Sequence, residues 1–229
     1  MAKVKKFVHS FSATKKFKQC RRIFHLDRVE RRFPFVKGEA AKRGDEIHDA
    51  LANFIGKSIV IPKKHRELLQ EYAVALKSRP GKKLVETKLG VRKDFTPCGY
   101  FDDDVYMRVI IDYVNVSPDG LKILVVDHKT GKDGYPDVDQ LRDNAVVLFA
   151  HFPEAEEVHG LLAFLDHDTN APAEFHREFL EDYQNQVLED CAEIDVALAT
   201  GDFPPTKGPL CPWCPNTECE FWSPPPNRK

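Results

Sequence analysis

The sequence predicts an α/β fold in which helices flank a central mixed β-sheet. Two observations support this class. Apolar side chains recur at helical spacing through most of the first 80 residues, and short runs rich in β-branched residues follow from about residue 83. The predicted order is three helices, three strands, a helix, a strand and a helix, which fits helices packed around one sheet.

Five helices are predicted. Gly56 ends the second, Pro62 opens the third, and Pro80-Gly81 closes it, as expected for residues that break or start helices. The predicted ranges are 12–29, 39–54, 63–77, 138–149 and 173–199.

Four strands are predicted, and two of them form a hairpin. Between the second and third strands, Ser117-Pro118-Asp119-Gly120 is a turn sequence, because Pro presets φ and Gly tolerates positive φ. The predicted ranges are 83–91, 105–116, 121–127 and 158–164.

The composition is that of a folded domain. The chain has 229 residues, of which 42% are hydrophobic, and this excludes collagen-like and strongly disordered classes. No apolar run approaches the roughly 18 residues of a membrane span, so we expect an intracellular protein that does not contact a membrane. Six cysteines are too few for a disulfide scaffold of this length.

The formal net charge of −2 conceals a division along the chain. Residues 1–33 carry a net charge of +9, and the remaining residues carry −11. In the basic segment Lys18, Arg21 and Arg22 alternate with aromatic residues, a pattern that suits phosphate contacts and base stacking. The alternative is an ordinary lysine-rich helix. Residues 151–203 hold 14 acidic residues and one basic one, and we expect them to form a solvated helix face and loops.

Charged residues end the predicted hairpin. Asp127 and Lys129 point to one face of their strand and His128 to the other. A turn centred near residue 119 places Asp112 opposite residue 126 or 127, so two carboxylates and one ammonium converge. Mg²⁺ or Mn²⁺ would relieve the repulsion between the carboxylates, and Lys129 could orient a water or stabilise charge on a phosphate. The alternative is a surface ion pair at a strand end.

These residues form an ordered set that resembles a known family. Asp112, then Asp127-His128-Lys129, then Gln140, resembles the PD-(D/E)XK nucleases of the RecB-like branch, which includes CRISPR-associated and phage exonucleases. Upstream, Gly44 and His48 match the Gly-x-x-x-His helix of that branch. The resemblance spans about residues 15 to 222 and implies a restriction-endonuclease-like core.

The resemblance implies a metal site. His48, Asp112 and Asp127 are implied side-chain ligands of Mg²⁺ or Mn²⁺, and the backbone carbonyl of His128 is an implied further ligand. By itself His48 shares a helix stripe with apolar residues and reads as an ordinary core histidine.

Further roles are implied for three residues. Lys129 is the implied catalytic lysine, Gln140 would position the site or the DNA, and Glu86 would match an acidic position of some members. Two positions depart from the family pattern: Val109 stands where Gly is usual, and Asn144 where Tyr is frequent.

Four cysteines form a second candidate site. Cys211, Cys214 and Cys219 lie within nine positions, and a tetrahedral metal site or cubane cluster needs a fourth ligand, for which Cys20 is the candidate. RecB-like nucleases with an iron–sulfur cluster have this arrangement, which implies a [4Fe–4S] cluster that joins the two ends of the chain. A structural Zn²⁺ and four unrelated thiols are the alternatives.

The resemblance implies a metal-dependent deoxyribonuclease, with exonuclease action on single strands or free ends favoured over endonuclease action. Its DNA substrate and protein partners would belong to recombination, repair, phage DNA metabolism or CRISPR adaptation. An inactive nucleic-acid-binding subunit, supported by Asn144, and a structure-specific endonuclease are the alternatives. We expect one nuclease domain over 1–229, with a basic segment (1–35), a core (38–200) and a cysteine segment (204–229). Its expected location is the cytoplasm of a bacterium, an archaeon or a phage-infected cell.

Overall fold

The computed structural model describes residues 6–34, 37–132, 134 and 136–225. These residues form two compact units, which are described separately. The first unit holds residues 6–8 and 37–185, and the second holds residues 9–34 and 186–225.

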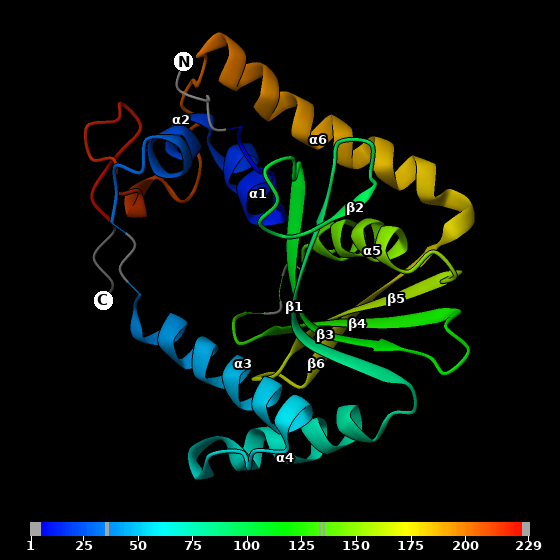
Figure 1. Cartoon of the computed structure of the whole chain (residues 1–229). Helices are drawn as coiled ribbons and strands as arrows, with labels where there is room; N and C mark the ends of the chain where they lie inside the picture. Colours follow the sequence, from blue (N-terminus) through cyan, green and yellow to red (C-terminus); the bar gives the residue numbers. More distant parts are fainter. Residues whose placement is uncertain (1–5, 35–36, 133, 135, 226–229) are drawn as a thin grey trace. The chain divides into compact units, whose positions relative to one another are not determined.

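The first unit is built on a six-stranded mixed sheet with the order β2-β1-β3-β4-β5-β6 (Figure 1). Strands β4 and β5 are parallel, and the other neighbours are antiparallel. The strands are β1 (Lys82–Val91), β2 (Pro97–Cys98), β3 (Met107–Val116), β4 (Lys122–Lys129), β5 (Glu157–Phe164) and β6 (Thr169–His176). The predicted mixed sheet with flanking helices is confirmed.

Helices cover both faces of this sheet. Ile55 of α3 (Glu39–Lys57) and Leu76 of α4 (Lys63–Ser78) are buried against Tyr113 of β3. On the opposite face Leu141 of α5 (Asp139–His151) lies against Gly160 of β5, within the crossover that joins β4 to β5. Within the described ranges, no helix is both long and apolar enough to cross a membrane.

The predicted hairpin is present. Strands β3 and β4 pair with Tyr113 opposite Val126, and Gly120 in the turn has a φ of +79°. Continuing this register by one position brings Asp112 opposite Asp127, one of the two predicted alignments. The hairpin therefore delivers both carboxylates to one place.

The predicted helix over 173–199 is wrong in its first part. Thr169–His176 forms β6, which pairs with β5, and α6 (Leu180–Thr200) begins only after a single 3₁₀ turn, η2 (Arg177–Phe179). Pro172 fits because β6 is an edge strand, where a missing N–H costs no ladder bond. Pairing with β5 therefore overrides a helical preference. The two-residue strand β2 was not predicted.

The second unit combines the basic N-terminal segment with the end of the chain. Its elements are α1 (Phe11–Gln19), α2 (Arg21–Phe24), the π-helical turn η1 (His25–Val29), the later part of α6 and the 3₁₀ turn η3 (Cys211–Trp213). The predicted helix over 12–29 is interrupted at Cys20, which has extended backbone angles. Phe24 packs edge-on against Phe17 at 5.2 Å and stacks on Phe203 at 6.3 Å between ring centroids, so aromatic contacts hold this unit together.

Candidate active site and cysteine cluster

The residues predicted to form the metal and catalytic site all lie in the first unit. Helix α3 supplies His48, and the adjacent strands and α5 supply the rest: Glu86 (β1), Asp112 (β3), Asp127, His128 and Lys129 (β4) and Gln140 (α5).

Asp112 joins two histidines. Its Oδ1 lies 3.2 Å from His48 Nδ1, and its Oδ2 accepts a 2.7 Å hydrogen bond from the backbone N–H of His128. Burial raises the pKa of Asp112, but the hydrogen bond and positive charge of His48 outweigh it and lower the pKa overall. The hydrogen bond to Asp112 raises the pKa of His48 to about 9, with the charges of Glu86 and Asp127 adding to the effect. His48 is therefore cationic at neutral pH, and a bound metal ion would replace that proton.

Gly44 allows α3 to approach the end of β4. A Cβ at this position would lie 3.2 Å from Thr130 Oγ1, closer than most Cβ contacts. One turn later the same helix carries His48, so the small residue in the Gly-x-x-x-His pattern brings the imidazole close to the carboxylates.

Asp127, Lys129 and Gln140 form a second group of contacts. Lys129 Nζ lies 2.5 Å from Asp127 Oδ2 and donates a 2.8 Å hydrogen bond to Gln140 Oε1, while Gln140 Nε2 donates to Asp127 Oδ1. The Asp127 side chain is only 8% exposed. Burial, followed by the negative charge of Asp112, raises the pKa of Asp127 to about 6, although Lys129 acts in the opposite direction.

The donor atoms fit a divalent cation. One ligand atom each from His48, Asp112 and His128 lie within 4.8 Å of one another. The structure does not bring Asp127, the other predicted side-chain ligand, into this group, and its Oδ2 is paired with Lys129. His128 Nε2 is buried without a hydrogen-bond partner among the described residues. Carboxylate oxygens with imidazole nitrogens suit Mn²⁺ well and Mg²⁺ through the oxygens.

Two groups at the site were not predicted from the sequence. The side chain of His128, expected to contribute only its carbonyl, packs edge-on against His48 at 5.8 Å and against Tyr72 of α4 at 5.6 Å between ring centroids. Burial raises the pKa of Tyr72, and its buried hydroxyl has no hydrogen-bond partner among the described residues. Tyr72 carries no sequence signal that separates it from an ordinary core aromatic.

Glu86 lies at the edge of the site in a strained conformation. Its φ is +47°, a left-handed value inside a strand, and its Oε1 lies 3.9 Å from His48 Nδ1. Burial and the charge of Asp112 raise the pKa of Glu86. Strain of this kind is often found at functional sites. A cavity of about 510 Å³ opens here, lined by Lys37, Ala41, Gly44, Asp45, His48, Asp49 and Glu86.

The two departures from the family pattern are both buried. Val109 is 6% exposed and lies in the core. Asn144 is 2% exposed on α5, and its Nδ2 has no hydrogen-bond partner in the described part of the chain. Neither side chain is accessible to a DNA strand in this conformation.

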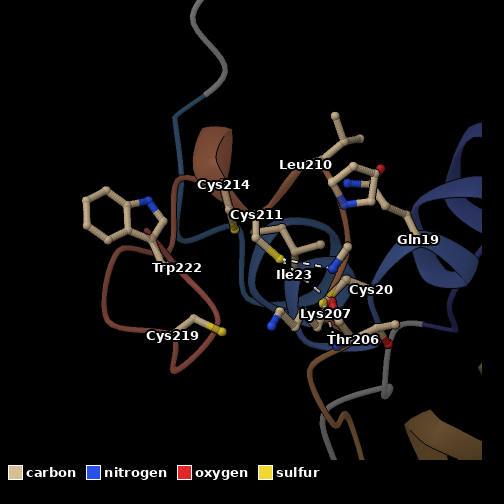
Figure 2. A pocket seen from close by; sticks show the side chains of 12 residues that line it. Gln19, Cys20, Ile23, Thr206, Lys207, Leu210, Cys211, Cys214, Cys219 and Trp222 are labelled. Atoms are coloured by element: carbon tan, nitrogen blue, oxygen red, sulfur yellow. Dashed lines mark hydrogen bonds between the residues drawn. The ribbon is translucent and has the colours of Figure 1, made fainter. Parts of the chain in front are cut away.

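The second unit gathers four cysteines around one cavity of about 320 Å³ (Figure 2). We call Cys20, Cys211, Cys214 and Cys219 the cysteine cluster. The backbone N–H groups of Thr206 and Gly208 donate to the sulfurs of Cys20 and Cys211 at 3.4 and 3.3 Å. Burial, reinforced by the three neighbouring cysteines, raises the pKa of the Cys214 thiol.

The predicted DNA-binding cations make ion pairs within the second unit, with nitrogen–oxygen distances of 2.6 to 2.9 Å. The pairs are Lys18–Asp190, Arg21–Glu193 and Arg22–Glu220. The acidic segment is thus not simply a solvated face, because α6 supplies counter-ions to the basic helices. DNA contact by these cations stays a prediction.

The fold and the carboxylate–lysine site define an α/β protein of the nuclease type. The family model of the PD-(D/E)XK nuclease superfamily matches residues 9–219, and the chain belongs to this superfamily. No curated protein matches the chain. Among solved structures, a candidate exonuclease from Eubacterium rectale is similar, with a TM-score of 0.52 and 14% sequence identity. The match covers 90% of this chain and 86% of the exonuclease chain, and it shows a common fold. The structure of SSO0001 has a TM-score of 0.43 and 12% identity over 81% and 75%, too low to support an argument.

Proposed function

We propose that this protein is an Mg²⁺- or Mn²⁺-dependent deoxyribonuclease that hydrolyses phosphodiester bonds. The observation that carries the proposal is that two contacts, His48–Asp112 and Lys129–Asp127, lie on the adjacent strands β3 and β4, near enough for the charge of Asp112 to raise the pKa of Asp127. Two buried carboxylates close to each other are costly to ionise, and a bound cation or a catalytic role would compensate for that cost.

In this proposal the residues have separate roles. The carboxylates of Asp112 and Asp127, with His48 and the His128 carbonyl, would hold the cation, which neutralises charge on the phosphate. Lys129 would orient the attacking water or stabilise the charge that develops on the phosphate oxygens. Because Gln140 contacts both Lys129 and Asp127, it fixes the ammonium relative to the carboxylate.

We favour a single-strand or end-dependent exonuclease. The similar fold from Eubacterium rectale bears the name of a candidate exonuclease, which agrees with this choice. Lys18, Arg21 and Arg22 would contact DNA by exchanging their carboxylate partners for phosphates. The setting would be recombination, repair, phage DNA metabolism or CRISPR adaptation inside a cell, with protein partners of such a pathway.

The test is cleavage of DNA labelled at the 5′ or 3′ end. With Mn²⁺, wild-type protein should shorten linear single strands and leave closed circular single strands intact, and Asp127→Ala and Lys129→Ala should be inactive. Lys122→Ala is the matched control, since Lys122 lies at the opposite end of β4 and pairs with Glu157 at 3.0 Å. Absence of cleavage by wild type with any divalent metal would overturn the proposal, and cleavage of circles would indicate an endonuclease.

The cysteine cluster is part of the proposal as the site of a [4Fe–4S] cluster. Four thiolates around a zinc ion lie about 3.8 Å apart, given zinc–sulfur bonds of about 2.3 Å. Among the described residues, no three of the four sulfurs come within 4.8 Å of one another, so the structure does not hold them at the spacing of a zinc site. Backbone N–H groups that point at the sulfurs of Cys20 and Cys211 are typical partners of cluster ligands. A bound cluster would join Cys20 to the last part of the chain.

A further inference from the structure

Beyond the candidate active site, strands β1 and β3 continue together past β4, and only the short strand β2 is added at the far end of β1 (Figure 1). Strand β4 pairs with Tyr113–Val116, whereas Met107–Ile111 pair, within the described residues, with β1 alone. Asp112 lies where this two-stranded ribbon begins. Side chains alternate along a strand, so Asp112, Ile110 and Arg108 belong to one face of the ribbon.

The same face continues onto β1 and the following loop. Lys88 is the cross-strand partner of Ile110. The ring centroid of Tyr100 lies 4.6 Å from the Arg108 guanidinium carbon and 6.0 Å from Lys88 Nζ. We call this surface, together with the neighbouring Phe101, the ribbon face: Lys88, Tyr100, Phe101, Arg108 and Ile110.

The ribbon face is open and carries two cations that form no ion pair among the described residues. Phe101 is 78% exposed and contacts Tyr100 edge-on, and Ile110 is 43% exposed. In the part of the chain that the structure describes, neither Lys88 nor Arg108 forms an ion pair, in contrast to the cations of the second unit. Exposed aromatics beside free cations are the elements that bind single-stranded nucleic acid.

Three acidic residues follow Phe101, and two of them are partly neutralised within their own loop. Asp102 accepts a 2.7 Å hydrogen bond from the backbone N–H of Gly99, and Asp104 pairs with Arg92 at 2.5 Å. These contacts direct both carboxylates toward the loop, so they leave the cations of the ribbon face available to a phosphate.

We propose that the ribbon face binds a single strand of DNA and leads it to the carboxylates at Asp112. The inference rests on the proposed nuclease function and deepens it. Arg108 lies four residues from Asp112, about 14 Å along the strand at ~3.4 Å per residue. That length corresponds to about four base steps at ~3.4 Å each, and to fewer when the strand is stretched. An unpaired base can stack on Phe101, whereas bases within a duplex have their faces covered.

The test measures binding of the full-length protein to a 5′-fluorescein-labelled 12-nucleotide oligo(dT) by anisotropy, in EDTA so that nothing is cleaved. Phe101→Ala should weaken binding about tenfold. Lys88→Ala with Arg108→Ala should weaken it further and reduce the salt-dependence slope by about 1.4, or ~0.7 for each lost phosphate contact. Phe179→Ala, which removes another exposed aromatic of the first unit, is the matched control and should bind like wild type.

Unchanged affinity and slope in the ribbon-face variants would overturn the inference, as would an equal loss on a 12-base-pair duplex. Circular dichroism melting of each variant excludes unfolding as the cause of a loss. Hydrolysis of bis(p-nitrophenyl) phosphate by wild type with Mn²⁺ tests the nuclease chemistry separately, because this small ester does not reach the ribbon. If wild type hydrolyses both the ester and DNA while the ribbon-face variants bind oligo(dT) normally, DNA binding by the ribbon face is refuted and the nuclease function stands. Wild type inactive on both would refute the nuclease function.

Discussion

Asp127→Asn should stabilise the protein at pH 7.5 in EDTA, although it removes a residue of the candidate active site. Burial raises the pKa of Asp127 from 3.8 to about 6, so folding disfavours its ionised form. Two pKa units correspond to about 3 kcal/mol. That net shift already includes the attraction of Lys129, but the amide NH₂ of asparagine cannot accept a hydrogen bond from the Lys129 ammonium, which costs about 1 kcal/mol, so we expect a gain of about 2 kcal/mol in the free energy of unfolding.

The stability difference between Asp127→Asn and wild type depends on pH. Because the folded-state pKa lies above the unfolded one, the native state binds the proton more tightly, and stability falls as pH rises through the interval from 3.8 to about 6. The penalty is fully present above pH 6 and absent below about 4. The advantage of Asp127→Asn should therefore be large at pH 7.5 and small at pH 4.5.

Urea unfolding followed by circular dichroism measures this difference in both proteins at both pH values. Asp119→Asn is the matched control, because the Ser117 hydroxyl and the Leu121 N–H lower the pKa of Asp119. Its replacement should not stabilise the protein at pH 7.5. A destabilised Asp127→Asn at pH 7.5, or an equal gain at pH 7.5 and 4.5, would refute the argument.

Addition of Mn²⁺ should make the wild type more stable than Asp127→Asn. At a Mn²⁺ concentration about 100 times the dissociation constant, the wild type gains about 2.7 kcal/mol. Asp127→Asn should gain much less, since a neutral amide is a poor ligand for a divalent cation. Addition of Mn²⁺ to the same samples measures both gains, and equal gains would remove Asp127 from the metal site.

Two further predictions concern the contacts of Gln140 and the cysteine cluster. Gln140→Leu should reduce the rate of DNA cleavage about ten- to hundredfold without loss of the fold, because Lys129 and Asp127 lose their common partner. Single-turnover cleavage measures the rate, and a thermal melt checks the fold. A wild-type rate in the variant would contradict a positioning role for Gln140. After anaerobic purification, wild type should be brown, absorb near roughly 400 nm and contain four iron and four sulfide ions per chain. Cys214→Ser should lose most of these ions and melt at a lower temperature. Cys191→Ser, which replaces a buried cysteine outside the cysteine cluster, should retain them. A colourless wild type with one zinc ion would refute the iron–sulfur site.

Most elements of the fold could be predicted because their signals are local. The turn at 117–120 fixes the hairpin register, and the register brings Asp112 to the level of Asp127. Alternation along β4 then separates His128 from Lys129. These relations depend on residues close in the sequence, so periodicity and turn chemistry were enough.

The errors occurred where distant contacts decide the conformation. Thr169–His176 became a strand because β5 offered hydrogen-bond partners across the sheet, which no local propensity reports. The N-terminal helix breaks at Cys20, where the chain turns extended for one residue. The acidic residues of α6 looked solvated, yet Asp190 and Glu193 pair with cations more than 170 positions away.

The sequence by itself determined the fold class, the hairpin and the identity of the charged residues at its end. Only the tertiary structure decided that His48 of α3 reaches Asp112 and that Tyr72 and the His128 ring lie beside them. It also decided that β1 and β3 continue past β4 with one face exposed. The physical reason is range: side-chain periodicity and turn preferences act over a few residues, whereas burial, ion pairing and pKa shifts depend on which distant groups exclude water from one another.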